Sequence, residues 1–192
     1  HGNVRMLVKG SEPGIATSDE LTAMQAIVEA GMREGAVGLS AGLTYTPAMY
    51  ADDNELIALN SVVAKFGGYY APHHRNYGRD FLNAVGDCIE ISRSSGAALH
   101  LTHCHMSSPQ FHGKTELLFD LISDGAKSGV DITLDTYPYL AGMTYLHALL
   151  PSWVQAGGIE TMRARLREPE VRKRVIHELM VTGSDGAHGN TL

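Results

Sequence analysis

Residues 69–105 read YYAPHHRNYGRDFLNAVGDCIEISRSSGAALHLTHCH, and this stretch decides the fold class. It holds a short apolar segment at 69–71, a run of apolar residues at helical spacing from about 79 to 94, and a second apolar segment at 98–102. Short apolar segments next to glycines are typical of buried strands, whereas the longer periodic run is typical of a helix. We therefore predict a strand–helix–strand unit in which each strand ends close to a histidine.

The same unit extends on both sides of this stretch. The periodicity predicts helices over 18–35, 52–66 and about 114–128, and strands over 36–40 and 130–135. Strand centres then fall near 38, 70, 100 and 133, a spacing that favours parallel strands joined by crossover helices. Periodicity alone fits both a (β/α)8 barrel and an open doubly wound sheet. Neither GxGxxG nor GxxxxGK[ST] occurs, so the nucleotide-binding open sheets lose support.

The regular pattern weakens after Asp135. We predict a loop or lid over 149–153, helices over 160–166 and 169–180, and a tail without periodicity from Gly183. Four or five strands are visible, whereas a closed barrel needs about eight. If the fold is a barrel, we expect the chain to carry roughly its middle half.

Composition excludes several classes of protein. The chain has 192 residues, of which 44% are hydrophobic and 19% charged, which is unlike a disordered chain. Fifteen basic against 21 acidic residues give a net charge of −6, so we expect no nucleic-acid partner. No apolar run is long enough to cross a bilayer, and two cysteines fit a reducing compartment. We therefore expect a cytoplasmic protein without a membrane partner.

Histidines follow two neighbouring predicted strands at the points where these strands end. His73 and His103 lie 30 residues apart, which is one helix–strand unit, so their side chains are expected to converge. Reactive groups gather at the carboxyl ends of parallel strands, and paired imidazoles there are typical zinc ligands. The alternative is that both are ordinary hydrogen-bonded loop residues.

Other polar residues lie at the same ends of the strands. Tyr45 is placed either to donate a hydrogen bond to an oxyanion or to cover the rim of the fold. Arg75 suits a substrate carboxylate or a surface salt bridge. His105 shares its facing with His103 and suits metal ligation, substrate contact or solvent exposure, of which we favour the last two. Asp135 is placed to orient a histidine.

The remaining candidates are interpreted as structural. Cys104 faces away from His103 along an extended chain, so packing is expected rather than catalysis. His74, His100 and His112 are each expected to be structural or exposed, with His100 inside a strand.

Four blocks of sequence together resemble the D-aminoacylase family, the N-acyl-D-amino-acid deacylase branch of the amidohydrolase superfamily. They are HGNVR at 1–5; GAVGLSAGLTY at 35–45; HHRN at 73–76; and LTH at 101–103 followed by DTYPYLAG at 135–142. The blocks occur in the family's order and with fitting spacing. The match is specific over residues 1 to about 150 and weaker beyond.

The resemblance implies a fold, a cofactor and residue roles. It implies a partial TIM-type (β/α)8 barrel of the metal-dependent hydrolase kind, with one or two zinc ions in the complete protein. His73 and His103 match the family's zinc ligands on the fifth and sixth barrel strands, and Tyr45 matches a tyrosine over the substrate carbonyl. The implied reaction is hydrolysis of an amide by zinc-activated water.

The sequence also departs from the family pattern. The family's His-x-His pair on the first strand and its bridging cysteine are absent from these residues. Asp185, in GSDG at 183–186, copies the local motif of the family's general base but follows the block at 135–142 too closely. His105 stands where the family usually has a lysine that binds the substrate carboxylate, which leaves the preference for D-amino acids open.

Residues 1–192 are therefore expected to be the central part of an amidohydrolase barrel, without the first-strand metal motif and the C-terminal strands. We expect the parent protein to deacylate small-molecule N-acyl-D-amino acids and the isolated chain to be poorly active or inactive. The alternatives are a cyclic-amide hydrolase of the hydantoinase or dihydroorotase kind, and a non-catalytic domain that binds a partner. Unpaired strand edges predict self-association of the isolated chain.

Overall fold

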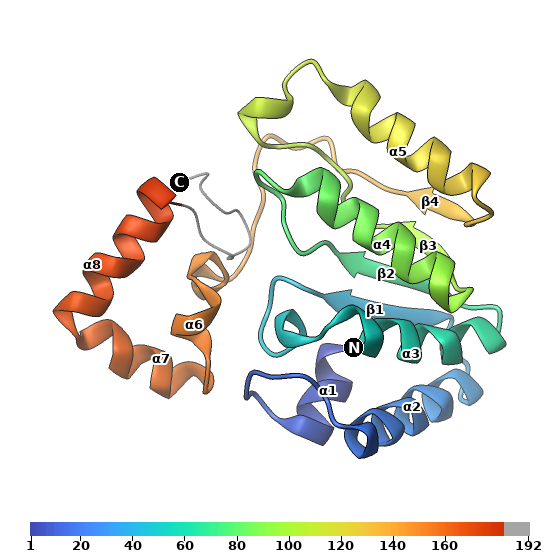
Figure 1. Ribbon diagram of the computed structural model, residues 1–192, viewed down its shortest axis with the longest axis horizontal. Helices are drawn as coiled ribbons and strands as arrows, with labels where there is room; N and C mark the ends of the chain where they lie inside the picture. Colours follow the sequence, from blue (N-terminus) through green and yellow to red (C-terminus); the bar gives the residue numbers. More distant parts are fainter. Residues whose placement is uncertain (183–192) are drawn as a thin grey trace.

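Four parallel strands form the centre of the computed structural model, which describes residues 1–182. The strands are β1 (Gly38–Gly42), β2 (Tyr69–His73), β3 (Ala98–Leu101) and β4 (Ile132–Leu134). They pair in chain order, β1-β2-β3-β4, and every pair is parallel. The predicted parallel sheet with crossover helices is confirmed (Figure 1).

The crossover helices all pack on one face of this sheet. They are α2 (Ser18–Arg33), α3 (Asp53–Lys65), α4 (Phe81–Ser95) and α5 (Thr115–Lys127). Side chains of α2 and α3 form one apolar cluster with β1, and those of α3, α4 and α5 form another with β1, β2 and β3. A doubly wound sheet reverses its strand order and carries helices on both faces, so this arrangement is that of a barrel wall.

The two faces of the sheet differ because side chains alternate along each strand. Leu39, Tyr70 and Leu99 are paired across the strands and buried under the helices. The opposite face carries exposed Ser40 and Tyr69, together with His100. This open face corresponds to the inside of a barrel.

The first strand begins two residues later than predicted. Gly35 ends the preceding turn with a φ of 106°, and the Val37 side chain is 68% exposed although the sequence suggested a buried strand residue. The register explains the shift, because Gly38 pairs with Tyr69 and Gly42 with His73. A side chain at position 38 would come within 2.2 Å of the Tyr69 carbonyl oxygen, so the close approach requires glycine.

Helix α1 (Gly2–Lys9) was not predicted. Its Arg5 side chain anchors it to the rest of the protein, because this residue is fully buried and donates to the Glu55 carboxylate on α3 and to the Gly14 carbonyl. Val4 and Val8 pack against the cluster that α2 and α3 share. The helix therefore depends on tertiary contacts that its own short sequence does not reveal.

The segment after β4 holds short helices. They are η3 (Leu146–Leu149), α6 (Ser152–Gln155), α7 (Gly158–Arg167), α8 (Pro169–His177) and the π-helical η4 (Glu178–Thr182). Single turns η1 (Ala48–Tyr50) and η2 (Pro109–Phe111) lie after β1 and β3. The loop predicted over 149–153 is wrong in part, because helix α6 begins at Ser152. In this helix Val154 is buried, and Leu150 and Trp153 pack with it against α7 and α8.

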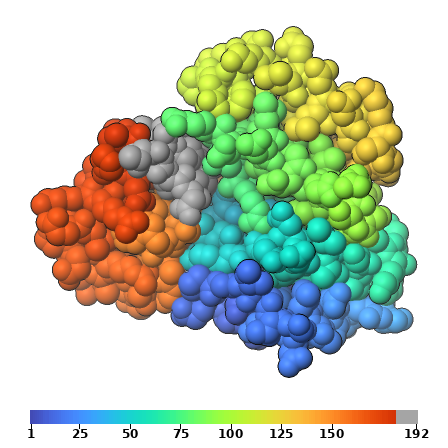
Figure 2. All heavy atoms as spheres, in the orientation of Figure 1, coloured from blue at the N-terminus to red at the C-terminus, as the bar shows by residue number. Residues whose placement is uncertain are grey.

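These C-terminal helices form a separate lobe beside the sheet, coloured orange to red in Figures 1 and 2. Two hydrogen bonds join α6 to the segment after β1: the Tyr50 hydroxyl donates to the Ser152 carbonyl at 3.2 Å, and Thr46 donates to Gln155 at 3.3 Å. None of the helices within residues 1–182 is both long and apolar enough to cross a membrane.

Candidate metal centre

His73 and His103 lie together at the carboxyl ends of adjacent strands. His73 is the last residue of β2, and His103 follows β3 by two residues. His103 Nε2 is 2.6 Å from His73 Nδ1, and the ring centroids are 4.2 Å apart. The structure thus brings together the two residues that the spacing predicted would converge.

Both imidazoles are half-buried in the protein and are suited to the neutral state. Burial lowers the pKa of His73, and the neighbouring His103 lowers it further. Burial is also the main cause that lowers the pKa of His103, against smaller opposing effects of nearby hydrogen bonds and Asp135. A neutral imidazole keeps a lone pair on one ring nitrogen, which is the form that binds a metal ion.

The backbone at His103 adopts an unusual conformation. Its φ of 34° is the one positive value outside glycine among residues 1–182. Asp135, directly after β4, accepts a 2.6 Å hydrogen bond from the His103 backbone N–H and pairs with His100 Nε2 at 2.9 Å. Asp135 therefore orients a histidine ring, as proposed from the sequence, and that ring belongs to His100. Asp135 contacts His103 through the His103 backbone N–H. Such strain is found where a side chain must point in a particular direction.

Tyr45 lies beside the histidine pair. Its ring makes an edge contact with His73 at 5.6 Å, and its hydroxyl shares a 2.7 Å hydrogen bond with Thr144. A Cβ at Gly42 would come within 2.9 Å of the Tyr45 ring, so glycine there allows the ring to fold back against the strand end. Tyr45 therefore lies next to His73, and its contact with a substrate oxyanion stays a prediction.

Arg75 and His105 have partners within the protein. Arg75 donates to the Ala51 carbonyl at 2.8 Å and to Asp53 at 3.3 Å, which is the surface salt bridge that the sequence left open. His105 Nε2 is 3.1 Å from the Tyr137 hydroxyl, and its ring centroid lies 6.4 Å from that of His103. His105 Nδ1 is buried and has no hydrogen-bond partner within residues 1–182. Substrate contact by either residue stays a prediction.

One residue near the pair, Tyr77, was not among the predicted site residues. Tyr77 is buried, and its hydroxyl is 3.1 Å from His103 Nδ1. His74, which the sequence suggested was structural or exposed, is fully buried, and neither ring nitrogen has a hydrogen-bond partner among residues 1–182. Burial lowers its pKa to about 3, with smaller contributions from nearby histidines. The only available signal was an aromatic residue four positions after His73. Cys104 is buried in the main apolar cluster, as predicted.

A complete metal site is not contained in residues 1–182. No group of three or more His, Cys, Asp or Glu side chains is arranged there to hold a metal ion. Asp185, the predicted general base, lies outside the described residues. Zinc sites use at least three protein ligands, so His73 and His103 fit a zinc ion as part of its ligand set.

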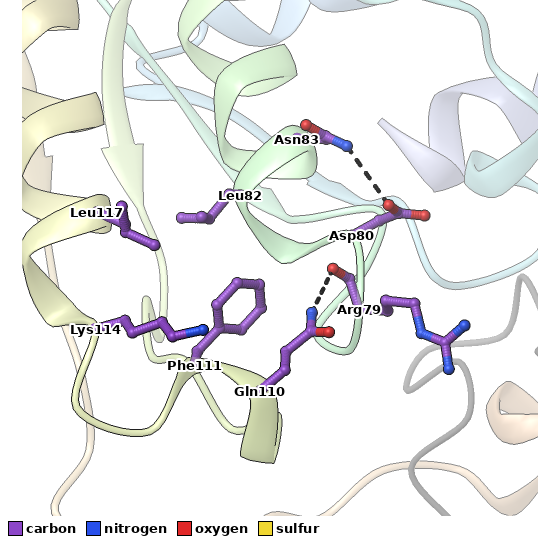
Figure 3. Close-up of a pocket in the computed structure, with 8 residues that line it drawn as sticks. All are labelled: Arg79, Asp80, Leu82, Asn83, Gln110, Phe111, Lys114 and Leu117. Carbon is purple, nitrogen blue, oxygen red and sulfur yellow. Dashed lines mark hydrogen bonds between the residues drawn. The ribbon is translucent and has the colours of Figure 1, made fainter.

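A pocket of about 340 Å³ lies between the segments that follow β2 and β3. It is lined by Arg79, Asp80, Leu82, Asn83, Gln110, Phe111, Lys114 and Leu117. Figure 3 shows the Arg79 guanidinium pointing away from the three apolar side chains, while Gln110 donates to the Arg79 carbonyl at 2.7 Å. None of the predicted site residues that the structure describes lines this pocket.

The chain is similar to a curated deacylase. D-aminoacylase of Alcaligenes xylosoxydans xylosoxydans is 33% identical over 147 residues, which cover 76% of this chain and 30% of that protein. No protein-family model matches the chain. The chain thus spans about 30% of the length of this relative.

Solved structures of deacylases are also similar to this chain. A crystal structure of D-aminoacylase that defines a novel subset of amidohydrolases superposes with a TM-score of 0.69 at 31% identity, over 74% of this chain and 30% of that one. Over about three quarters of its length, this chain is similar to D-aminoacylase in both sequence and fold. The structure of N-acyl-D-glutamate deacylase from Bordetella bronchiseptica was solved with zinc and a phosphonate mimic of the tetrahedral intermediate. It superposes with a TM-score of 0.69 at 32% identity, over 72% of this chain and 29% of that one. A further D-aminoacylase structure, with 0.69 at 30% identity over 74% and 30%, concerns a binuclear metal centre.

The comparisons confirm the resemblance stated from sequence and the fold that it implies. The four parallel strands of this chain correspond to part of the barrel of the amidohydrolase neighbours, so the fold is that of a partial barrel. The placement of residues 1–192 at the centre of that barrel stays a prediction, as do the ligand roles of His73 and His103.

Proposed function

We propose that this segment supplies two zinc ligands and a tyrosine to a metal-dependent deacylase of N-acyl-D-amino acids. The observation that carries the proposal is the 2.6 Å approach of His103 Nε2 to His73 Nδ1 at the carboxyl ends of β2 and β3. The similarity to deacylases, one of them solved with zinc, supports the same metal and substrate class. The remaining ligands come from outside residues 1–182.

Each residue has a chemical task in this proposal. His73 and His103 hold the ion through neutral imidazole nitrogens. A bound zinc ion supplies a Lewis acid that polarises the amide carbonyl and lowers the pKa of water to about 7. The Tyr45 hydroxyl donates a hydrogen bond to the oxyanion that forms from the carbonyl. That task requires Tyr45 to exchange its hydrogen bond with Thr144 for one with the substrate.

The relatives support the proposed substrate class, and composition supports the proposed location. We expect a small-molecule N-acyl-D-amino acid, one or two zinc ions and no nucleic-acid partner. A cytoplasmic location rests on the two free cysteines, Cys88 and Cys104.

Metal content tests the ligand assignment. The product of the gene that encodes this sequence is expected to bind at least one zinc ion, measured by plasma mass spectrometry after dialysis. His73→Ala and His103→Ala should each lower zinc affinity by at least about tenfold, because each substitution removes one ligand from a site that needs at least three. His112→Ala removes an exposed histidine and should leave zinc unchanged. Equal zinc affinity in all four proteins would refute the assignment.

Activity tests the substrate class separately. We expect hydrolysis of N-acetyl-D-amino acids over their L-enantiomers and over cyclic ureides by the same gene product. Tyr45→Phe should lower kcat by about 100-fold with little change in zinc content, because it removes one oxyanion donor. Faster turnover of the cyclic ureides would favour the cyclic-amide alternative. Zinc binding without any hydrolysis would favour the non-catalytic alternative.

A further inference from the structure

The Tyr77 hydroxyl connects the two segments that carry the histidine pair. It accepts a 3.1 Å hydrogen bond from the backbone N–H of His74, the residue after His73. It also lies 3.1 Å from Nδ1 of His103, which is on the segment after the next strand. Tyr77 is only 7% exposed, so water competes little for these bonds.

The direction of the second bond decides which nitrogen of His103 is free. If His103 Nδ1–H donates to the hydroxyl, the lone pair lies on Nε2, the atom 2.6 Å from His73. If the hydroxyl donates to Nδ1, the proton lies on Nε2 and blocks that atom. A histidine that binds a metal uses its other ring N–H to bond an acceptor, which fixes the tautomer and the ring orientation.

We propose that Tyr77 is a positioning residue, whose hydroxyl accepts the His103 Nδ1 proton and directs the Nε2 lone pair toward His73. The same hydroxyl ties the His74 backbone to the His103 ring, so it fixes the distance between the two predicted ligands. The inference rests on the proposed metal centre, but the tautomer is a property of the metal-free protein and is measured without zinc.

Burial keeps the Tyr77 hydroxyl protonated and neutral, and its two oxygen lone pairs are enough to accept from both the His74 N–H and His103 Nδ1–H. Burial raises the pKa of Tyr77 far above its usual value, and the His74 N–H opposes this only in part. The Tyr77 ring also makes edge contacts with His103 at 5.4 Å, so a phenylalanine would keep the ring packing and lose the hydroxyl alone.

Tyr70 offers a matched control. It is a fully buried tyrosine on β2, and its hydroxyl has no hydrogen-bond partner in the part of the chain that the structure describes. Tyr70→Phe thus removes a buried hydroxyl from the same strand–loop region without touching either histidine. Thermal unfolding of both variants shows that they are folded before any other measurement.

The experiment has two readouts at pH 7.5. Ring ¹⁵N NMR of the metal-free protein, with His103 assigned from a His103→Gln spectrum, reports the tautomer. We expect Nδ1–H in the wild type and in Tyr70→Phe, and a rise of the Nε2–H form in Tyr77→Phe. Zinc titration should give a Kd about 10 to 100 times higher for Tyr77→Phe than for the other two.

The outcomes separate this inference from the proposed function. A wild type with His103 in the Nε2–H form overturns the inference even if Tyr77→Phe fails to fold. An unchanged tautomer and Kd in a folded Tyr77→Phe also overturn it. If the wild type binds no zinc, the metal proposal fails, whereas the tautomer shift still supports the placement of His103 by Tyr77.

Discussion

Glu55 is a buried carboxylate that lies between two basic side chains. It is 2% exposed, pairs with His1 Nε2 at 2.7 Å and accepts a hydrogen bond from Arg5. Burial raises its pKa, and the hydrogen bonds from His1 and Arg5 outweigh burial, so its pKa is lowered from 4.5. At the residue scale, this carboxylate connects α1 to α3 and therefore to the sheet.

Glu55→Gln should destabilise the protein by about 3–5 kcal/mol, because it leaves the buried Arg5 charge without its partner. Urea unfolding at pH 7 measures this difference. Glu29→Gln is the matched control, since Glu29 pairs with Arg33 on the exposed face of α2 and should cost less than about 1 kcal/mol. Similar losses in the two variants would contradict the role of Glu55.

The Glu55 carboxylate also gives stability a pH dependence. Its pKa is lower in the folded than in the unfolded protein, so its contribution is present above about pH 4.5 and is lost as pH falls through the folded pKa. We expect the wild type to lose more stability than Glu55→Gln between pH 5 and pH 3. Parallel pH profiles of the two proteins in urea unfolding would show that Glu55 does not titrate as described.

Helix α2 shows which signals in the sequence are sufficient for an element. Thr17 accepts from the Glu20 backbone N–H at 3.3 Å, and the Glu20 carboxylate accepts from the Thr17 N–H at 2.7 Å. This reciprocal capping box fixes the start of the helix at Ser18, where the sequence predicted it. The helix then buries Met24, Val28 and Met32.

Thr17→Ala should lower the free energy of unfolding by about 1 kcal/mol, because it leaves a helix N–H without an acceptor. Thr22→Ala is the control on the same helix. Its hydroxyl donates to the Ser18 carbonyl within the helix, and alanine is a better helix former, so stability should be unchanged or slightly higher. Thermal unfolding of both variants distinguishes a cap from a general effect of losing a hydroxyl.

Local pattern predicted the helices and strands that carry their own signals. The bounds of α3, α4 and α5 fall within two residues of the predicted ranges, because apolar spacing and flanking glycines mark them. Helix α1 was missed because it is eight residues long and is fixed by the distant Glu55. The lobe after Pro151 was predicted only in part, since it depends on contacts such as Arg174 over the Trp153 ring at 4.1 Å.

Only the part of the candidate site that lies at the ends of strands could be predicted from the sequence. His73 and His103 converge because one helix–strand unit separates them, and the sheet register follows from that unit. The partners of His105 and Arg75, and the burial of His74 and Tyr77, depend on how loops fold over the strand ends. No local periodicity describes such loops.

The whole molecule leaves one face of its sheet and a long apolar segment exposed. Within residues 1–182, β1 and β4 each have a neighbouring strand on one side only. The segment that follows β4 exposes Tyr139, Leu140 and Met143. Unpaired edges and apolar surface of this kind favour association between chains.

We therefore expect the isolated chain of 192 residues to self-associate at micromolar concentration in sedimentation velocity. The double variant Leu140→Lys/Met143→Lys should shift the distribution toward monomer, because it places charge on the exposed segment. Leu7→Lys/Ile15→Lys alters two exposed apolar residues near α1 and should leave the distribution unchanged. A monomeric wild type would contradict the expectation.

The backbone conformation of His103 lowers the stability of the protein, whereas its imidazole is proposed to bind zinc. At a φ of 34°, glycine is the residue that suits the chain, so His103→Gly should release backbone strain of about 1 kcal/mol or more that His103→Ala retains. The protein has an imidazole at a position where the backbone conformation favours glycine. Selection for heat resistance alone would thus favour glycine at this position, and under the proposed function that gain would remove a zinc ligand.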